Sequence, residues 1–178
     1  MSLASRITRQ PIPFDPAAAQ DLRASLSGFA PGVMDLMAAT AGCSPYLRGL
    51  MLREADWLRE AVEAPEAALE AALAAPGAVA ADALALALRA AKRRVALLSA
   101  LCDLGGAWPL EAVTGALTRL ADRAVHLALT TQVAEEIRRG KLPGATPEDA
   151  ATAGGMVALA MGKMGAGELN YSSDIDLI

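Results

Sequence analysis

Two long stretches of the chain carry an apolar residue at every third or fourth position, and this spacing limits the folds open to it. In the first stretch the apolar positions are Leu84, Leu88, Ala91, Val95, Leu98 and Cys102. In the second they are Leu110, Val113, Leu117, Leu120, Ala124 and Leu127. Such spacing places apolar side chains along one side of an α-helix. We expect helices from about Ala81 to Gly105 and from Pro109 to about Arg139, packed antiparallel.

The composition agrees with a mostly helical fold. Hydrophobic residues make up 54% of the 178 residues, Ala and Leu dominate, and aromatic residues account for only 3%. Ala and Leu are strong helix formers, whereas the β-branched and aromatic residues that strands favour are scarce. The net charge of -4 provides no basic field for nucleic acid, so any nucleotide bound here should be a small molecule or be attached to a protein.

Four shorter helical segments are expected upstream, each with a proline in its first turn. They start at Pro16, Pro31, Pro45 and Pro65 and extend to about Ser27, Ala41, Leu58 and Ala75. Together with the long pair they predict a bundle of five to seven helices between Asp15 and Arg139. The first dozen residues read as an extended or mobile arm, and Lys141 to Ala153 as a linker. We therefore predict a helical domain over residues 1–150 and a second unit over 151–178.

The cysteine and histidine content supports neither a zinc site nor a disulfide framework. Cys43 and Cys102 lack metal-ligand spacing, and both are expected to be reduced and buried. His126, the only histidine, is expected on the polar side of its helix. The cluster Arg89, Lys92 and Arg93 is interpreted as a solvated helix face. With neither a signal peptide nor a membrane span in view, a cytoplasmic protein is expected.

The end of the chain has a different pattern. An unbroken apolar run, Met156 to Met161, precedes a Gly-rich turn and then Ser-Asp-Ile-Asp-Leu-Ile at 173–178. In a strand, side chains alternate between two faces, so Asp174 and Asp176 would share one face with Cα atoms about 6.6 Å apart. Two carboxylates at this spacing suit Mg²⁺ and phosphoryl or nucleotidyl transfer. In a complete α/β fold such an apolar run is a strand buried on both faces. The elements that would cover it are not expected in this chain, so the run should be disordered, dock on the helical bundle or pair with another molecule.

Small polar residues and glycines surround the two aspartates. Gly162 and Gly165 permit a tight turn whose N–H groups could point at phosphate oxygens, although glycines in a turn often serve geometry alone. Lys163 is the nearest cation and could assist or simply be solvated. Ser172 and Ser173 could donate hydrogen bonds to phosphate or cap the turn.

The stretch from Gly162 to Ile178, GKMGAGELNYSSDIDLI, closely resembles the signature of the glutamine synthetase adenylyltransferase and adenylyl-removing enzymes. This chain differs from the usual signature at Ala160, Met164, Ala166 and Gly167, and the last change replaces an arginine. A second stretch, CSPYLRGLMLREADWL from Cys43, also resembles an N-terminal element of the family, although it would equally suit an ordinary amphipathic hairpin.

The resemblance implies several things that the residues alone do not. It implies a polymerase-β-like nucleotidyltransferase domain of α/β type that starts near residue 151 and is truncated at Ile178, so that this piece alone should be inactive. Asp174 and Asp176 would be catalytic Mg²⁺ ligands, with Gly162, Lys163, Gly165, Ser172 and Ser173 binding nucleotide or phosphate. Asn170 to Ser173 resembles the adenylyl-removing half, which phosphorolyses tyrosyl-AMP on glutamine synthetase to ADP. Glutamine synthetase, a PII-type regulator, phosphate and AMP, ADP or ATP would be its partners.

Two alternatives to this reading stay open. The chain could be a non-catalytic helical module that binds glutamine synthetase or a PII regulator. It could also belong to the ATP-dependent adenylylating half, because the same metal-binding pair would serve both directions of the reaction.

Overall fold

The computed structural model describes all 178 residues and confirms the mostly helical fold. Seven α-helices form the first part of the chain: α1 (Pro16–Ser25), α2 (Pro31–Ala41), α3 (Pro45–Arg53), α4 (Ala55–Ala61), α5 (Pro65–Ala74), α6 (Leu84–Leu104) and α7 (Leu110–Arg138). Short 3₁₀ turns accompany them as η1 (Ala4–Arg6), η2 (Ala75–Ala78), η3 (Ala81–Ala83) and η4 (Pro147–Gly155). A single turn, α8 (Gly162–Gly165), lies in the last part.

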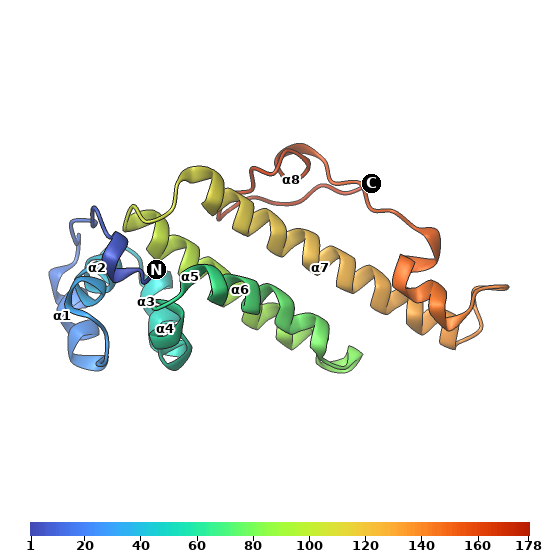
Figure 1. The fold of residues 1–178 in the computed structure, drawn as a ribbon, viewed down its shortest axis with the longest axis horizontal. Helices are drawn as coiled ribbons and strands as arrows, with labels where there is room; N and C mark the ends of the chain where they lie inside the picture. Colours follow the sequence, from blue (N-terminus) through green and yellow to red (C-terminus); the bar gives the residue numbers. More distant parts are fainter.

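Helices α6 and α7 run antiparallel, as their apolar stripes predict, and form the long axis of the molecule (Figure 1). On α6 the stripe residues Val95, Leu98 and Cys102 are fully buried. On α7 the buried stripe begins at Val113, because Leu110 is 68% exposed in the first turn. The prediction for Leu110 is therefore wrong: it is the first residue of the helix, and its side chain is not covered there.

The helix starts agree with the sequence signals. The Asp15 carboxylate accepts hydrogen bonds from the amides of Ala17 and Ala18, and the Ser44 hydroxyl accepts one from Leu47. These side chains satisfy amides that no helical carbonyl can reach, and the proline that follows each cap needs no such partner.

The segment expected as one helical stretch after Pro45 is divided at Glu54, between α3 and α4. Glu54 is only 7% exposed, and its carboxylate accepts hydrogen bonds from Arg93 at 2.7 Å and Arg94 at 3.0 Å on α6. Arg94 also stacks over the ring of Trp57 at 5.3 Å. The expectation of a solvated face is thus wrong for Arg93, because a buried carboxylate requires the cation there.

Two further expectations concern the N-terminal region. The expected extended or mobile arm is non-helical over residues 7–14, but it is held to the bundle at Leu3, which is fully buried and whose amide donates to the Val62 carbonyl at 2.7 Å. The expectation that Cys43 is buried is wrong: the residue is exposed, and its thiol donates to the Ile12 carbonyl at 3.1 Å. Cys102 is buried as expected, and burial raises the pKa of its thiol to about 12.

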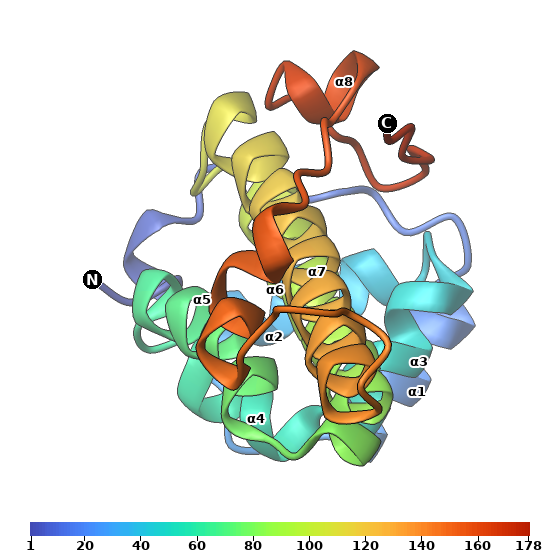
Figure 2. The same ribbon diagram turned by 90° about the vertical axis from the view of Figure 1, so that its right-hand side faces the viewer.

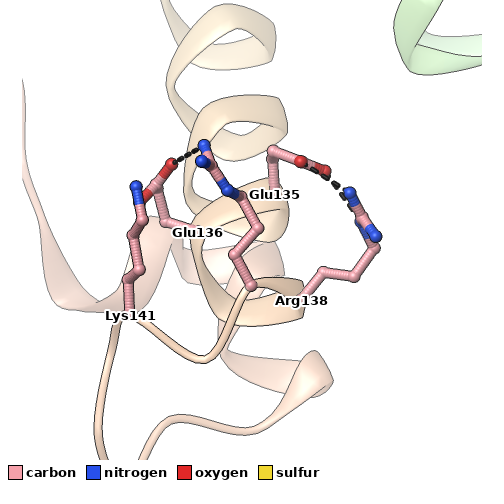
Figure 3. Close-up of polar contacts among 5 residues, drawn as sticks. Glu135, Glu136, Arg138 and Lys141 are labelled. Carbon is pink, nitrogen blue, oxygen red and sulfur yellow. Dashed lines mark hydrogen bonds and ion pairs between the residues drawn. The ribbon is translucent and has the colours of Figure 1, made fainter.

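The last turns of α7 carry several ion pairs, and η4 packs against this end of the helix. Glu135 pairs with Arg138 at 2.6 Å, and Glu136 pairs with Lys141 at 3.3 Å (Figure 3). Residues 147–155, expected within or beside a linker, instead form η4 and pack against α7 with Ala153 buried. The expected linker is thus ordered over these residues, because α7 extends far enough to offer η4 an apolar surface. The division of the chain at residue 150 stays a prediction.

Candidate functional site

After η4 the chain turns back along α7, and it lies on the side of α7 away from α3 and α4 in both views (Figures 1 and 2). Two stretches of this return pair as an antiparallel ribbon with a bridge between Ala160 and Leu177. The amides of Leu159 and Ile178 donate to each other's carbonyls at 2.7 and 3.0 Å, and the Met161 amide donates to the Asp176 carbonyl at 2.9 Å. The pairing therefore brings the start of the Gly-rich turn beside Asp176.

The apolar run Met156 to Met161 is not buried on both faces, in agreement with the expectation that nothing covers it fully in this chain. Val157 is 75% exposed, and Met156, Leu159 and Met161 are exposed as well. The physical reason is that the run pairs with only one short stretch and faces α7 on one side alone. An apolar cavity of about 300 Å³ lies between the ribbon, η4 and α7, lined among others by Met164, Leu177 and Val125.

Both candidate metal ligands, Asp174 and Asp176, are exposed, and neither carboxylate takes part in an ion pair or hydrogen bond within the chain. The side chains alternate along this stretch, so Leu177 lines the cavity toward α7 while Asp176 belongs to the other face. Two carboxylates without competing cations are suitable donors for Mg²⁺, which often takes one or two protein carboxylates and completes its shell with water and phosphate. No group of three or more metal-ligating side chains occurs in the structure.

The Gly-rich turn is the short helix α8. The amides of Gly165, Ala166 and Glu168 donate to the carbonyls of Met161, Gly162 and Lys163, so they are occupied within the turn. The amides of Gly162 and Lys163 precede the first hydrogen bond of that turn and are free to meet a ligand. A Cβ atom at Gly165 would overlap the carbonyl oxygen of Ala160, so this glycine is required by close approach of the backbone. The Lys163 side chain is exposed.

The residues before the aspartates form a closed turn. The Ser173 hydroxyl donates to the Asn170 side-chain oxygen at 2.9 Å and accepts from the Asn170 amide at 3.1 Å. The Ser172 amide donates to the same side-chain oxygen at 3.1 Å. Ser173 thus serves the turn in this structure, whereas the exposed Ser172 hydroxyl remains available to a ligand.

Three side chains attach this stretch to the helices. Met164 and Leu169 are buried in the same core cluster as Val113 and Leu117 of α7. The Leu169 amide donates to the Thr118 hydroxyl at 3.2 Å. A third attachment comes from Tyr171.

Tyr171 reaches the C-terminal end of α6. Its hydroxyl donates to the Asp103 carboxylate at 3.4 Å. Partial burial, together with the negative charge of Asp103, raises the pKa of Tyr171 above its usual value. Sequence analysis missed Thr118 and Asp103 as neighbours of the site, because each lies more than fifty positions from its partner and inside an ordinary helical pattern.

None of the helices combines the length and the apolar character that crossing a membrane would require. His126 is exposed on α7, in agreement with its interpretation as a surface residue.

The chain is similar to known proteins over nearly its whole length. A family model described as glutamate-ammonia ligase adenylyltransferase matches residues 33–178. The bifunctional glutamine synthetase adenylyltransferase/adenylyl-removing enzyme of Rhodopseudomonas palustris is 42% identical over 99% of this chain and 20% of its own length. The enzyme of the same description from Caulobacter vibrioides is 42% identical over 98% of this chain and 19% of its own length. No solved structure matches.

This chain thus spans about a fifth of the length of the curated relatives. The match nevertheless includes most of α2, helices α3 to α7, the Gly-rich turn and both aspartates. The chain therefore belongs to the glutamate-ammonia ligase adenylyltransferase family.

Proposed function

We propose that the protein containing this chain removes AMP from adenylylated glutamine synthetase by phosphorolysis, and that residues 162–176 supply part of the site. One observation carries the proposal: the hydrogen bond from Met161 to Asp176 places the Gly-rich turn directly beside the aspartate pair. The relatives' description as adenylyltransferase and adenylyl-removing enzymes supports the class of reaction. The resemblance of Asn170 to Ser173 to the removing half supports the direction.

In the proposed reaction, an oxygen of inorganic phosphate forms a bond to the phosphorus of tyrosyl-AMP. The bond from that phosphorus to the tyrosyl oxygen breaks, which gives ADP and a tyrosine that regains its hydroxyl proton. Asp174 and Asp176 would hold Mg²⁺, which when bound neutralises charge on the transferred phosphoryl group. The Lys163 side chain, the Gly162 amide and the Ser172 hydroxyl would hold phosphate oxygens, while Gly165 and Ser173 shape the backbone around them.

The substrate partners follow from the same proposal. Glutamine synthetase, phosphate and adenine nucleotides would be bound by the complete protein in the cytoplasm, and a PII-type protein would regulate it. ATP-dependent adenylylation is the second candidate, because the family description names an adenylyltransferase. The same carboxylates would serve that reaction, so the two directions are separated by the substrates supplied and not by the residues.

The test replaces Asp174 and Asp176 singly by Asn in the native protein. We expect the rate of ADP release from adenylylated glutamine synthetase, at saturating phosphate and Mg²⁺, to fall by about 100-fold or more, because each change removes a metal-binding charge. Asp82→Asn is the matched control, since Asp82 is also exposed and unpaired but lies in η3. Parental rates in both variants would refute the proposed direction of the reaction. If the same variants instead lost AMP incorporation from ATP, the second candidate would be favoured, and parental rates of both reactions would refute the metal-site assignment.

A further inference from the structure

Thr118 on α7 makes two hydrogen bonds that point in different directions. Its hydroxyl donates to the Thr114 carbonyl one turn earlier at 2.9 Å. The same oxygen accepts the Leu169 amide at 3.2 Å. Because the hydroxyl proton is committed to the helix, the lone pairs face the returning chain.

The Leu169 amide is buried, so losing the Thr118 oxygen as its acceptor would cost free energy. Leu169 and Thr118 are 4% and 5% exposed, and Met164 is buried beside them. A buried amide without a partner costs free energy comparable to a lost hydrogen bond, and water has no access here to replace one. The Thr118 hydroxyl is therefore the group that fixes the backbone at Leu169.

Little freedom remains between Leu169 and the first aspartate. Asn170 and Ser173 close the intervening turn with mutual hydrogen bonds. Tyr171 within that turn is held at Asp103, on the end of α6. A shift of the backbone at Leu169 is thus transmitted to Asp174 five residues later.

We propose that Thr118 is a positioning residue, through which α7 sets the location of the Asp174 and Asp176 carboxylates. It touches neither substrate nor metal and acts through the backbone at Leu169. The effect on catalysis rests on the proposed function, whereas the anchoring of Leu169 does not. Misplacement of reacting groups by about 1 Å costs up to about 100-fold in rate, so the anchor has a measurable consequence.

The experiment compares Thr118→Val, Thr118→Ser and Thr130→Val. Val keeps the shape of Thr but removes the acceptor, while Ser restores the hydroxyl. Thr130 is the matched control, because its hydroxyl donates to the carbonyl one turn earlier on the same helix, at His126, and accepts nothing from the returning chain. Amide hydrogen exchange is measured in this chain by NMR, and Mg²⁺-dependent deadenylylation is measured in the native protein.

We expect Thr118→Val to speed exchange at Leu169 by at least about tenfold, and to speed it at Asn170, Ser172 and Ser173, whose amides are hydrogen-bonded within the adjoining turn, with exchange in α1–α6 unchanged. In the native protein we expect kcat to fall by about 10- to 100-fold and the half-saturating Mg²⁺ concentration to rise, with the binding of glutamine synthetase unchanged. Thr118→Ser should restore both measurements to near parental values, and Thr130→Val should change neither.

Several outcomes would overturn the proposal, and they separate it from the proposed function. Fast exchange of the Leu169 amide in the parental chain would show that the anchor does not form, and this holds even if Thr118→Val fails to fold. An unchanged kcat and Mg²⁺ dependence in Thr118→Val, with Asp174→Asn inactive, would show that the anchor is structural only. If Asp174→Asn and Asp176→Asn both keep parental rates, the proposed function fails, while the exchange result still decides the anchor.

Discussion

The helical bundle buries most of its large apolar side chains, whereas the returning segment, residues 156–178, buries Met164 and Leu169 and leaves most of its other large apolar side chains exposed. In the bundle, large apolar residues such as Leu36, Leu98 and Leu101 are fully buried. In the returning segment, residues as apolar as Val157 and Ile178 are exposed. The bundle buries its carboxylate at Glu54 between two arginines, whereas Asp174 and Asp176 have no partner within the chain.

This difference separates residues that hold the fold from residues that are available for binding. A paired charge such as Glu54 gains its stabilisation from its partners, and an unpaired carboxylate contributes nothing to stability until a ligand arrives. Substitutions should therefore affect the unfolding free energy mainly in the bundle and binding or chemistry mainly in the returning segment. The predictions below test that contrast, from the largest expected change in unfolding free energy to the smallest.

The largest loss of stability is expected for Leu98→Ala. Leu98 is fully buried on α6, so the change removes apolar contacts and leaves a cavity, at a cost of about 3 kcal/mol. Leu177→Ala is the counterpart in the returning segment and should cost less than about 0.5 kcal/mol, because Leu177 is exposed. Urea unfolding followed by circular dichroism measures both. Equal losses would contradict the contrast.

Glu54→Gln should destabilise the chain by about 2 kcal/mol at pH 7, because it removes a buried charge bonded to Arg93 and Arg94. Burial alone would raise the pKa of Glu54, but the hydrogen bonds and charges of the two arginines outweigh it and hold the pKa below its usual 4.5. The folded chain thus binds this proton more weakly than the unfolded chain, so the stabilisation is full above about pH 4.5 and lost as the pH falls through the folded-state pKa.

Unfolding measured from pH 7 to pH 3 tests the sign of this effect. The parental chain should lose stability below about pH 4.5 more steeply than Glu54→Gln. Parallel curves for the two proteins would show that the carboxylate is not stabilised by its arginines.

Two glycine substitutions should have effects in different places. Gly115→Ala, in α7 with open space around it, should stabilise the bundle by about 0.8 kcal/mol through helix propensity. Gly165→Ala should leave bundle unfolding within about 0.5 kcal/mol, yet speed amide exchange at Met161 and Ile178, because its Cβ would displace the Ala160 carbonyl. Thermal unfolding and hydrogen exchange measure the two effects. A large loss of bundle stability in Gly165→Ala would mean that the two regions unfold together.

The smallest change is expected for Glu70→Gln. Glu70 pairs with Arg119 at 2.5 Å, but both side chains are at least half exposed. Exposed pairs contribute little, so we expect a loss of no more than about 0.5 kcal/mol that disappears in 1 M salt. The comparison with Glu54→Gln in the same urea experiment isolates the effect of burial on the stabilisation by an ion pair. Losses of unfolding free energy of the same size in both variants would show that burial does not set this stabilisation.

The sequence predicted the parts of the fold that depend on near neighbours. Asp15 caps α1 through amides two and three positions away, and the stripe on α6 repeats every three or four residues. The break at Glu54 depends on arginines about forty positions later, and the burial of Leu3 depends on Val62. No local sequence pattern identifies partners this far apart, so the helix break at Glu54 and the burial of Leu3 could not be predicted.

The same limit applies to the candidate site. The motif identified Asp174, Asp176 and the Gly-rich turn by residue type and spacing, and the family match includes them. Their roles stay predictions. The anchors Thr118 and Asp103 come from helices elsewhere in the chain, so no local pattern identifies them.

Helix α7 sets the distance between two contacts made by the chain that follows it. Its 29 residues span about 43 Å, and η4 packs near Val133 while Leu169 of the returning segment bonds to Thr118. These places are about four turns apart on one helix, and each inserted residue would rotate one by about 100° relative to the other. Length changes should therefore be tolerated in the connection at 140–146, which carries neither contact, and be selected against between the two docking points.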